Sequence, residues 1–238
     1  MLFLIVVMGM MSCHSVPKEI KVTSPDGNIV VQAGSQKGGV PFYTVAYKGK
    51  TVIDTSWLGI LGKNLNLTKG FEVNDVVYSS HNGSWKPVLG EVAEIAEHYN
   101  EMKLSLKGEA GQKLDVIFRV FDDGLGFRYH IPKQGSSDTL TVLDEISEFS
   151  LTGDHQAWWI PGDYDSNEHV YSTSNLSEID AFAYNAPSYE KKIYTQHIVL
   201  PKAVQTPFTM KAEDGVHLCI HEAALKDFPV LHRDETGN

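Results

Sequence analysis

Apolar and polar residues alternate with a period of two along most of the chain, the pattern of strands that bury one face. The stretch KLDVIFRVFDDGLGFRYHIP shows it most clearly, with a turn at residues 122–124 that contains Gly124. Its alternating apolar positions are Leu114, Val116, Phe118 and Val120 before the turn, and Phe127, Tyr129 and Ile131 after it. This spacing predicts a β-hairpin with one face in a core.

Three further stretches have the same organisation around short turns. They are EIKVTSPDGNIVVQAG, which turns at Asp26-Gly27, PFYTVAYKGKTVIDTSWLGIL, which turns at Lys48-Gly49-Lys50, and PFTMKAEDGVHLCIHEAAL, which turns at Asp214-Gly215. DTLTVLDEISEFSL and KKIYTQHIVL add single strands. GEVAEIAEHYNEMKL has some helical spacing, but it leads into KLSLKG, and we expect an irregular strand pair there. The pattern predicts an all-β fold, one antiparallel sandwich over residues 18–238.

The stretch AWWIPGDYDSNEHVYSTSNLSE, residues 157–178, does not have a strand pattern, and a long loop inside a compact domain often carries function. Trp158 and Trp159 are adjacent, so on a strand they face opposite ways: one is expected in the core, and the other on a sugar ring or the sandwich edge. Trp158, Trp159 and Glu168 are therefore the candidate substrate-binding residues. DYDSNE begins like an EF-hand loop, but Glu168 and Ser174 stand where that loop needs Gly and Glu, so a polar loop is expected.

The strand pattern VHLCI leads directly into a carboxylate. Val216, Leu218, Ile220 and Glu222 share one face of this strand, and His217, Cys219 and His221 share the other. Glu222 either meets water at the sandwich rim or points at a hard cation such as Ca²⁺, for which carboxylate oxygens are suitable ligands. A zinc site on the opposite face is disfavoured, because positions i and i+4 of a strand lie about 13 Å apart and a fourth ligand is needed.

Composition and charge narrow the possible partners. The chain has 238 residues, of which 42% are hydrophobic, so it can bury a core, and its formal net charge of −10 disfavours nucleic acid and anionic lipid. The N-terminal residues MLFLIVVMGMMSC are too short to span a bilayer and have the apolar run of a secretory signal, and Cys13 resembles a bacterial lipidation site. We expect residues 1–13 to be an export signal. With only Cys13 and Cys219 present, no disulfide framework is expected.

Several stretches together resemble the N-terminal domain of glycoside hydrolase family 97, which contains α-glucosidases and α-galactosidases. They are SPDGNI, WKPVLGEVAEIAEHYNEM, DDGLGFRYHIP, AWWIPGDYDSNEHVYSTS and TPFTMKAEDGVHLCIHEAALKDFP. The resemblance implies a β-super-sandwich of the galactose-mutarotase type, which in this family precedes a (β/α)₈ catalytic barrel and a small C-terminal β-domain. It also implies exo-acting, exported, Ca²⁺-dependent enzymes whose catalytic carboxylates lie on the barrel. By its place in H-E-A-A-L, Glu222 would be the carboxylate that the N-terminal domain lends to the calcium site.

The chain ends at Asn238, shortly after this motif, and a barrel is missing from it. We therefore expect a non-catalytic N-terminal part of an exported α-glycosidase, located in the periplasm or at the outer membrane of a Gram-negative bacterium. Its expected partners are the barrel, in cis or as a split chain, and an oligosaccharide substrate, with membrane contact only through a lipid anchor. The alternative is a stand-alone carbohydrate-binding module that uses Trp158 and Trp159. A mutarotase-like epimerase is disfavoured, because His221 and Glu222 are sequential and face apart.

Overall fold

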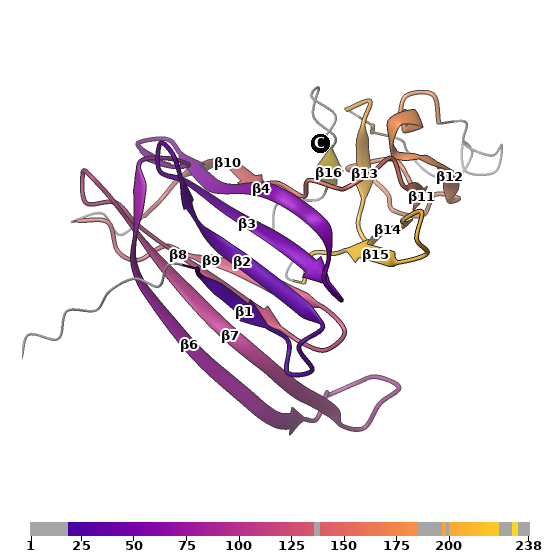
Figure 1. The fold of residues 1–238 in the computed structure, drawn as a ribbon. Coiled ribbons are helices and arrows are strands. Elements are labelled where there is room, and N and C mark those ends of the chain that lie inside the picture. The colour runs from indigo at the N-terminus through magenta and orange to yellow at the C-terminus, as the bar shows by residue number, and fades with distance from the viewer. Residues whose placement is uncertain (1–18, 136–138, 185–196, 199, 224–229, 233–238) are drawn as a thin grey trace, which may run out of the picture. The chain divides into compact units, whose positions relative to one another are not determined.

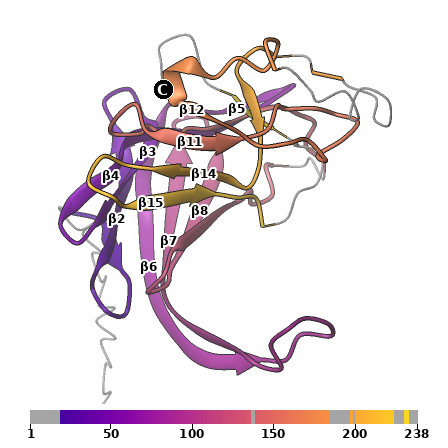
Figure 2. The same ribbon diagram turned by 90° about the vertical axis from the view of Figure 1, so that its right-hand side faces the viewer.

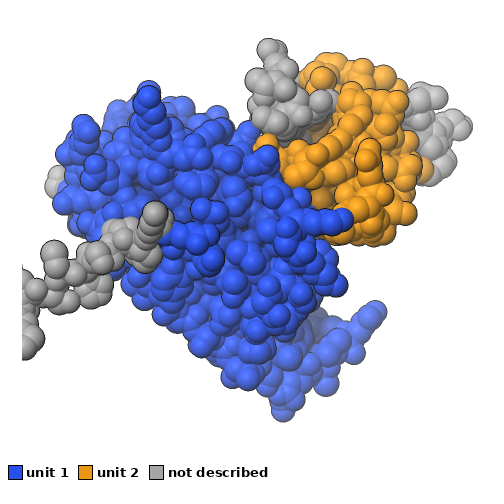
Figure 3. Space-filling view, in the orientation of Figure 1, with its two compact units in different colours: residues 1–149 blue, residues 150–238 orange. Residues whose placement is uncertain are grey.

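The chain forms two compact units, residues 1–149 and residues 150–238 (Figure 3). The computed structural model describes residues 19–135, 139–184, 197–198, 200–223 and 230–232. Every element of these residues is a β-strand except one short 3₁₀ helix, η1, Leu176–Glu178, and every strand pairing is antiparallel. The predicted all-β antiparallel architecture is therefore confirmed. Among the described residues, none of the helical structure could cross a membrane.

The first unit consists of two sheets (Figure 1). One has the order β1-β2-β3-β4-β10, with β5 added to β4; its strands are β1 Lys21–Thr23, β2 Ile29–Gln36, β3 Val40–Tyr47, β4 Lys50–Gly62, β5 Leu65–Leu67 and β10 Val142–Ser147. The other joins consecutive strands; they are β6 Phe71–Trp85, β7 Ile95–Gly108, β8 Lys113–Val120 and β9 Leu125–His130. The hairpins predicted at Asp26-Gly27, at Lys48-Gly49 and at residues 122–124 are all present.

The core of this unit follows the predicted alternation along β8. Leu114, Val116, Phe118 and Val120 are fully buried. Tyr43 of β3 packs against this row from the other sheet, with ring centroids 6.0 Å from Phe118 and 5.4 Å from Phe127 of β9. Its hydroxyl donates a hydrogen bond of 2.8 Å to the carbonyl oxygen of Glu148, and burial raises the pKa of the Tyr43 phenol, which therefore stays a neutral donor. Aromatic contacts thus join the two layers.

Two glycine positions show why the chain turns where it does. Lys48 and Gly49 both have positive φ, 49° and 78°, between the paired residues Tyr47 and Lys50, the geometry of a two-residue hairpin turn of type I′. Gly39 has φ 73°, and a Cβ at this position would lie 2.2 Å from the backbone nitrogen of Phe71. The Phe71 N–H donates a hydrogen bond of 2.9 Å to the Gly39 carbonyl, so only glycine allows this approach of the β2–β3 turn to β6.

The β6–β7 hairpin is the longest element of the molecule, with paired residues from Phe71↔Gly108 to Trp85↔Ile95. The sequence pattern does not indicate β6. The preference for strand over helix in GEVAEIAEHYNEMKL is confirmed, but the stretch contains one strand, β7, after a loop, and its partner β6 precedes the stretch. Continuous cross-strand pairing with β6 explains the regularity of β7. Both views show the far end of this hairpin extending beyond the other strands of its unit (Figures 1 and 2).

The second unit is built on a sheet of order β12-β11-β14-β15 and a separate pair, β13-β16. The strands are β11 Gln156–Trp159, β12 Ser172–Asn175, β13 Ala203–Gln205, β14 Phe208–Lys211, β15 His217–Ile220 and β16 Val230–His232. The expectation that residues 157–178 contain no strands is wrong at both ends, because β11 and β12 pair with each other. Most of KKIYTQHIVL lies outside the described residues. The core cluster consists of Ala157, Trp159, Ile179, Val204, Phe208 and Met210.

Candidate functional site

Glu222 follows the end of the β14–β15 hairpin, whose predicted turn at Asp214-Gly215 is present. Leu218 and Ile220 pack against the core cluster, while His217 and Cys219 are exposed, so the predicted alternation along β15 is confirmed. Glu222 lies two residues beyond the last strand residue and is half-buried. The apolar row of β15 therefore leads to a carboxylate at the border between the core of this unit and solvent.

One oxygen of the Glu222 carboxylate has a neutral partner: the Thr206 hydroxyl donates to its Oε2 over 3.1 Å. Within the part of the chain that the structure describes, no lysine or arginine forms an ion pair with this carboxylate. The same residues contain no group of three potential metal ligands of the His, Cys, Asp and Glu types. Since Ca²⁺ takes roughly six to eight oxygen ligands, Glu222 could serve such an ion only as one ligand among several.

The opposite face of β15 does not form a zinc site among the described residues, which contain no cluster of three ligands. His217 instead stacks beside Trp158, with ring centroids 6.2 Å apart and 15° between the planes. Cys219 is exposed, and its sulfur lies 3.4 Å from the Thr209 hydroxyl of the neighbouring strand.

The two adjacent tryptophans of β11 face opposite ways, as predicted. Trp159 is 5% exposed in the core, and its Nε1 donates to the Ser174 hydroxyl over 3.0 Å. Trp158 is half-buried on the outer face of the sheet. Glu168 is exposed in the loop that follows β11, where its backbone N–H donates to the Ser166 hydroxyl. Of the two tryptophans, Trp158 is therefore the one with ring surface at the outside of this unit.

The loop between β11 and β12 contains a buried pair that the sequence does not reveal. His169 Nε2 lies 3.0 Å from Asp163 Oδ2, and neither side chain has exposed surface. Asp163 Oδ1 accepts hydrogen bonds from the backbone N–H groups of Asp165, at 2.8 Å, and His197, at 3.0 Å. These bonds occupy the Asp163 carboxylate inside the protein, which supports the prediction of a polar structural loop in place of a calcium loop. A spacing of six residues between Asp and His carries no signal that could have indicated the pair.

A second cluster that sequence reasoning missed lies on the sheet β6-β7-β8-β9. Asp115 is 5% exposed, and its Oδ2 lies 2.8 Å from His130 Nδ1 and 3.0 Å from Lys103 Nζ. Burial acts to raise the pKa of Asp115, but hydrogen bonds from His130 and Ser105 and the charge of Lys103 outweigh it, so the pKa lies below its ordinary value. The carboxylate is satisfied by its own sheet, and we assign it a structural role.

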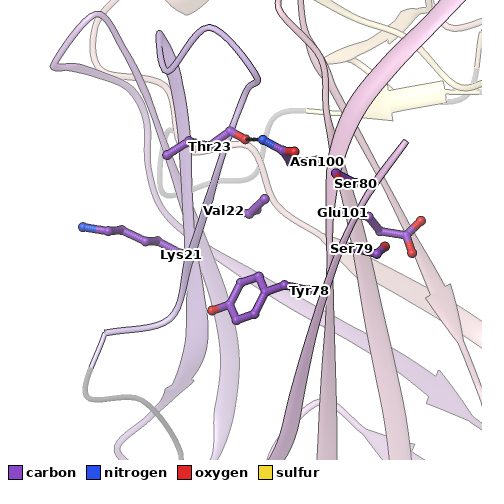
Figure 4. Close-up of a pocket in the computed structure, with 8 residues that line it drawn as sticks. All are labelled: Lys21, Val22, Thr23, Tyr78, Ser79, Ser80, Asn100 and Glu101. Atoms are coloured by element: carbon purple, nitrogen blue, oxygen red, sulfur yellow. Dashed lines mark hydrogen bonds between the residues drawn. The ribbon is translucent and has the colours of Figure 1, made fainter. Parts of the chain in front are cut away.

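A polar groove of about 410 Å³ opens between β1 and the β6–β7 hairpin (Figure 4). The Asn100 amide donates to the Thr23 carbonyl across it, over 2.9 Å. Its remaining lining residues are Lys21, Val22, Tyr78, Ser79, Ser80 and Glu101. None of the predicted site residues lines this groove. Cys13, the predicted lipidation site, lies outside the described residues.

Comparison with known proteins gives a consistent set of relatives. The chain is 25% identical over 236 residues to the retaining alpha-galactosidase of Bacteroides thetaiotaomicron, covering 90% of this chain and 30% of the relative. It is 32% identical over 114 residues to a probable retaining alpha-galactosidase of Streptomyces bingchenggensis, covering 48% of this chain and 17% of that protein. The chain thus spans less than a third of the length of these curated relatives.

Solved structures with a similar fold include glycoside hydrolases. A glycoside hydrolase family 97 enzyme from Pseudoalteromonas sp. strain K8, solved in complex with panose, has a TM-score of 0.76 and 32% identity, covering 90% of this chain and 30% of that one. A beta-arabinopyranosidase shares the fold, with a TM-score of 0.62 and 23% identity. The glycosyl-hydrolase 97 N-terminal family matches residues 22–238. The predicted family resemblance is confirmed: this chain belongs to the glycosyl-hydrolase 97 N-terminal family.

Proposed function

We propose that this chain is the non-catalytic N-terminal portion of an exported, calcium-dependent α-glycosidase, and that it packs on a (β/α)₈ barrel and lends the Glu222 carboxylate to a calcium site there. The observation that carries the proposal is the match over 90% of this chain to 30% of a family 97 enzyme. The acidic net charge of −10 and the apolar N-terminal run are compatible with an exported protein that does not bind nucleic acid.

The environment of Glu222 supports its role as a contributed ligand. Its carboxylate is half-buried, its Oε2 accepts from the neutral Thr206 hydroxyl, and no lysine or arginine of the described residues neutralises it. A carboxylate with this exposure keeps oxygen lone pairs for a cation. When bound, Ca²⁺ supplies a positive charge that orients substrate oxygens. The acid and base carboxylates of the reaction would belong to the barrel.

The test joins this chain to the part of the Pseudoalteromonas family 97 enzyme that follows its own N-terminal segment. The fused enzyme should hydrolyse a nitrophenyl α-glucoside or α-galactoside in the presence of Ca²⁺, whereas the chain alone should not. Glu222→Gln should raise the Ca²⁺ concentration for half-maximal activity by on the order of tenfold, because it removes one charged oxygen ligand. The matched control is Glu213→Gln in the exposed β14–β15 turn, which should leave the calcium response unchanged.

Two results would contradict the proposal. A calcium response that is the same in Glu222→Gln and in the unmodified fusion would remove Glu222 from the site. Turnover by the chain alone would show that it contains its own catalytic groups. A titration of the chain alone with Ca²⁺ should show binding no tighter than roughly the millimolar range, because a single carboxylate cannot complete the coordination of the ion.

The second candidate function is a carbohydrate-binding surface at Trp158. The half-buried indole on the outer face of the β12-β11-β14-β15 sheet favours it, because aromatic rings stack on the apolar faces of sugars. His217 already stacks beside this ring, so a sugar would have to use the remaining surface. Titration of the chain with panose should show no saturable tryptophan fluorescence change under the first proposal. A change that Trp158→Ala abolishes would favour the binding surface.

A further inference from the structure

The far end of the β6–β7 hairpin has a concentration of apolar side chains in water. Residues 85–95, which the structure describes without a gap, contain five of them. Their exposed fractions are Trp85 50%, Val88 98%, Leu89 89%, Val92 57% and Ile95 37%. Such a concentration of exposed apolar side chains in one short segment is typical of an interaction site. We call these five side chains the hairpin tip.

The tip is connected to its unit by the paired part of the hairpin from Ser80↔Asn100 to Trp85↔Ile95, which we call the stem. The Asn100 amide donates to the Thr23 carbonyl of the first sheet, and beyond this bond the strands continue in register to the end of the stem. Figures 1 and 2 both show this part of the hairpin extending past the neighbouring strands. The tip therefore lies beyond the core of its own unit.

Side chains on one face of the stem brace it. The Arg119 guanidinium lies 4.6 Å from the centre of the Tyr99 ring, and its Nε donates to Glu101 over 2.7 Å. His81 of β6 stacks on the same Tyr99 ring, with 5.2 Å between the ring centroids. The hydrogen bond to Glu101 is the largest influence on Arg119 and raises the pKa of its guanidinium, which stays charged. These cross-strand contacts favour a preformed arm over a flexible one.

We propose that the hairpin tip docks on the catalytic portion of the family 97 enzyme, a partner surface with an apolar recess for Trp85, Val88 and Leu89. This inference rests on the proposed function and specifies which surface of this chain makes the contact. It is supported by the share of the family enzyme that this chain covers, 30%, which leaves a large further portion in that enzyme. Interfaces between domains of one chain typically bury about 600–1,500 Å², an area to which these side chains can contribute.

Charge argues against two other occupants. The residues around the tip include the acidic side chains Glu91, Glu94 and Glu97 against one basic side chain, Lys86, and the chain as a whole carries a formal net charge of −10. An anionic lipid surface would repel such an arm, and a second copy of the chain would bring the same negative charge against it. The catalytic portion is the occupant that these observations favour.

Hydrogen exchange of the chain alone and of the fused enzyme tests the docking. Amides of the loop between Trp85 and Ile95 should exchange at least about tenfold more slowly in the fused enzyme, because docking removes them from water. The double change Val88→Ser and Leu89→Ser should abolish that protection. The control is Leu143→Ser at an equally apolar position of β10 that is 61% exposed, and it should leave the protection of the loop intact.

Two outcomes would overturn the inference. The first is equal exchange of residues 85–95 in the chain and in the fused enzyme. The second is sedimentation of the chain alone as a dimer that Val88→Ser with Leu89→Ser converts into a monomer, which would assign the tip to a second copy. Exchange does not require turnover, whereas the proposed function is read from activity and its calcium response through Glu222. If the fused enzyme is active and its calcium response depends on Glu222, but the tip is not protected from exchange, the docking is wrong and the proposed function stands.

Discussion

The imidazole of His169 lies against the carboxylate of Asp163, with 3.0 Å between Nε2 and Oδ2 and no exposed surface on either side chain. The second oxygen of Asp163 accepts the backbone N–H of His197, and the Asp163 carbonyl accepts the Gln205 amide over 2.8 Å. One aspartate thus fastens the β11–β12 loop to two later segments. The buried carboxylate is stable in this position because His169 and the backbone N–H groups of Asp165 and His197 are its hydrogen-bond partners.

Asp163→Ala should therefore destabilise the second unit strongly. Removing one partner of a buried pair costs about 3–5 kcal/mol, because the remaining donors lose their acceptor. Hydrogen exchange of residues 155–180 against urea concentration measures the loss within this unit. Asp165→Ala, an exposed neighbour in the same loop, should cost less than about 0.5 kcal/mol. Equal effects of the two changes would show that the buried pair is not important for stability.

Gly39→Ala and Gly38→Ala should differ sharply although the residues are adjacent. Both have positive φ, 73° and 86°, so each substitution carries a backbone cost of about 1–2 kcal/mol. Only at Gly39 would the new Cβ meet backbone, 2.2 Å from the Phe71 nitrogen, whereas nothing lies within 4 Å at Gly38. Thermal unfolding should show a clearly larger loss for Gly39→Ala. Similar midpoints would mean that the approach to β6 relaxes without cost.

Asp115→Asn should remove stability that depends on pH. The folded pKa of Asp115 lies below its ordinary value, so the contribution of the carboxylate is complete above the unfolded pKa, about 3.9, and is lost as the pH falls through the folded pKa. The variant should lose about 1.5–3 kcal/mol near neutral pH, the range for hydrogen bonds to a charged group. The deficit should shrink as the pH falls below about 3.9, the unfolded value, and on through the lower folded pKa.

Urea unfolding at a series of pH values measures this deficit. Asp123→Asn in the exposed β8–β9 turn is the control, and its stability should follow that of the unmodified chain. The groups that face the Asp115 carboxylate are His130, Lys103 and Ser105, so Lys103→Met should reproduce part of the loss. A deficit of Asp115→Asn that stays constant down to acid pH would contradict the ionised pairing.

Two buried histidines of the second unit should respond in opposite ways to replacement by leucine. His155 is 5% exposed, and neither ring nitrogen has a hydrogen-bond partner among the described residues, whereas His169 bonds to Asp163. His155→Leu should be neutral or raise the free energy of unfolding by about 1–2 kcal/mol, because it removes unsatisfied polar atoms. His169→Leu should lower it. A loss at His155 as large as that at His169 would disprove this difference.

Local sequence signals predicted the strands that are joined by short turns. Gly27, Gly49 and Gly215 adopt positive φ between paired strands, and the alternation along β8 gives its fully buried face. These features depend on neighbours in the sequence, so the sequence contains them. The split of Trp158 and Trp159 between surface and core follows from the same two-residue period.

Features that depend on distant partners were not predictable in this way. β6 has a polar and irregular sequence, and it forms a strand because β7 pairs with it along its whole length. The clusters around Asp163 and Asp115 assemble from separate segments, so no spacing of residues in the sequence predicts them. The β11–β12 pairing was missed because strands of four residues give too short a pattern to detect.

The pairing of β10 with β4 has a consequence for the order of assembly. Ser147 lies opposite Leu58, and Ile146 lies opposite Gly59, although all four strands of the other sheet are encoded between them. During synthesis from the N-terminus, the edge of β4 that pairs with β10 therefore stays unpaired until the whole β6–β9 meander has left the ribosome. A nascent chain that stalls inside this meander presents an unpaired strand margin, and this is where we expect chaperone binding or aggregation to begin.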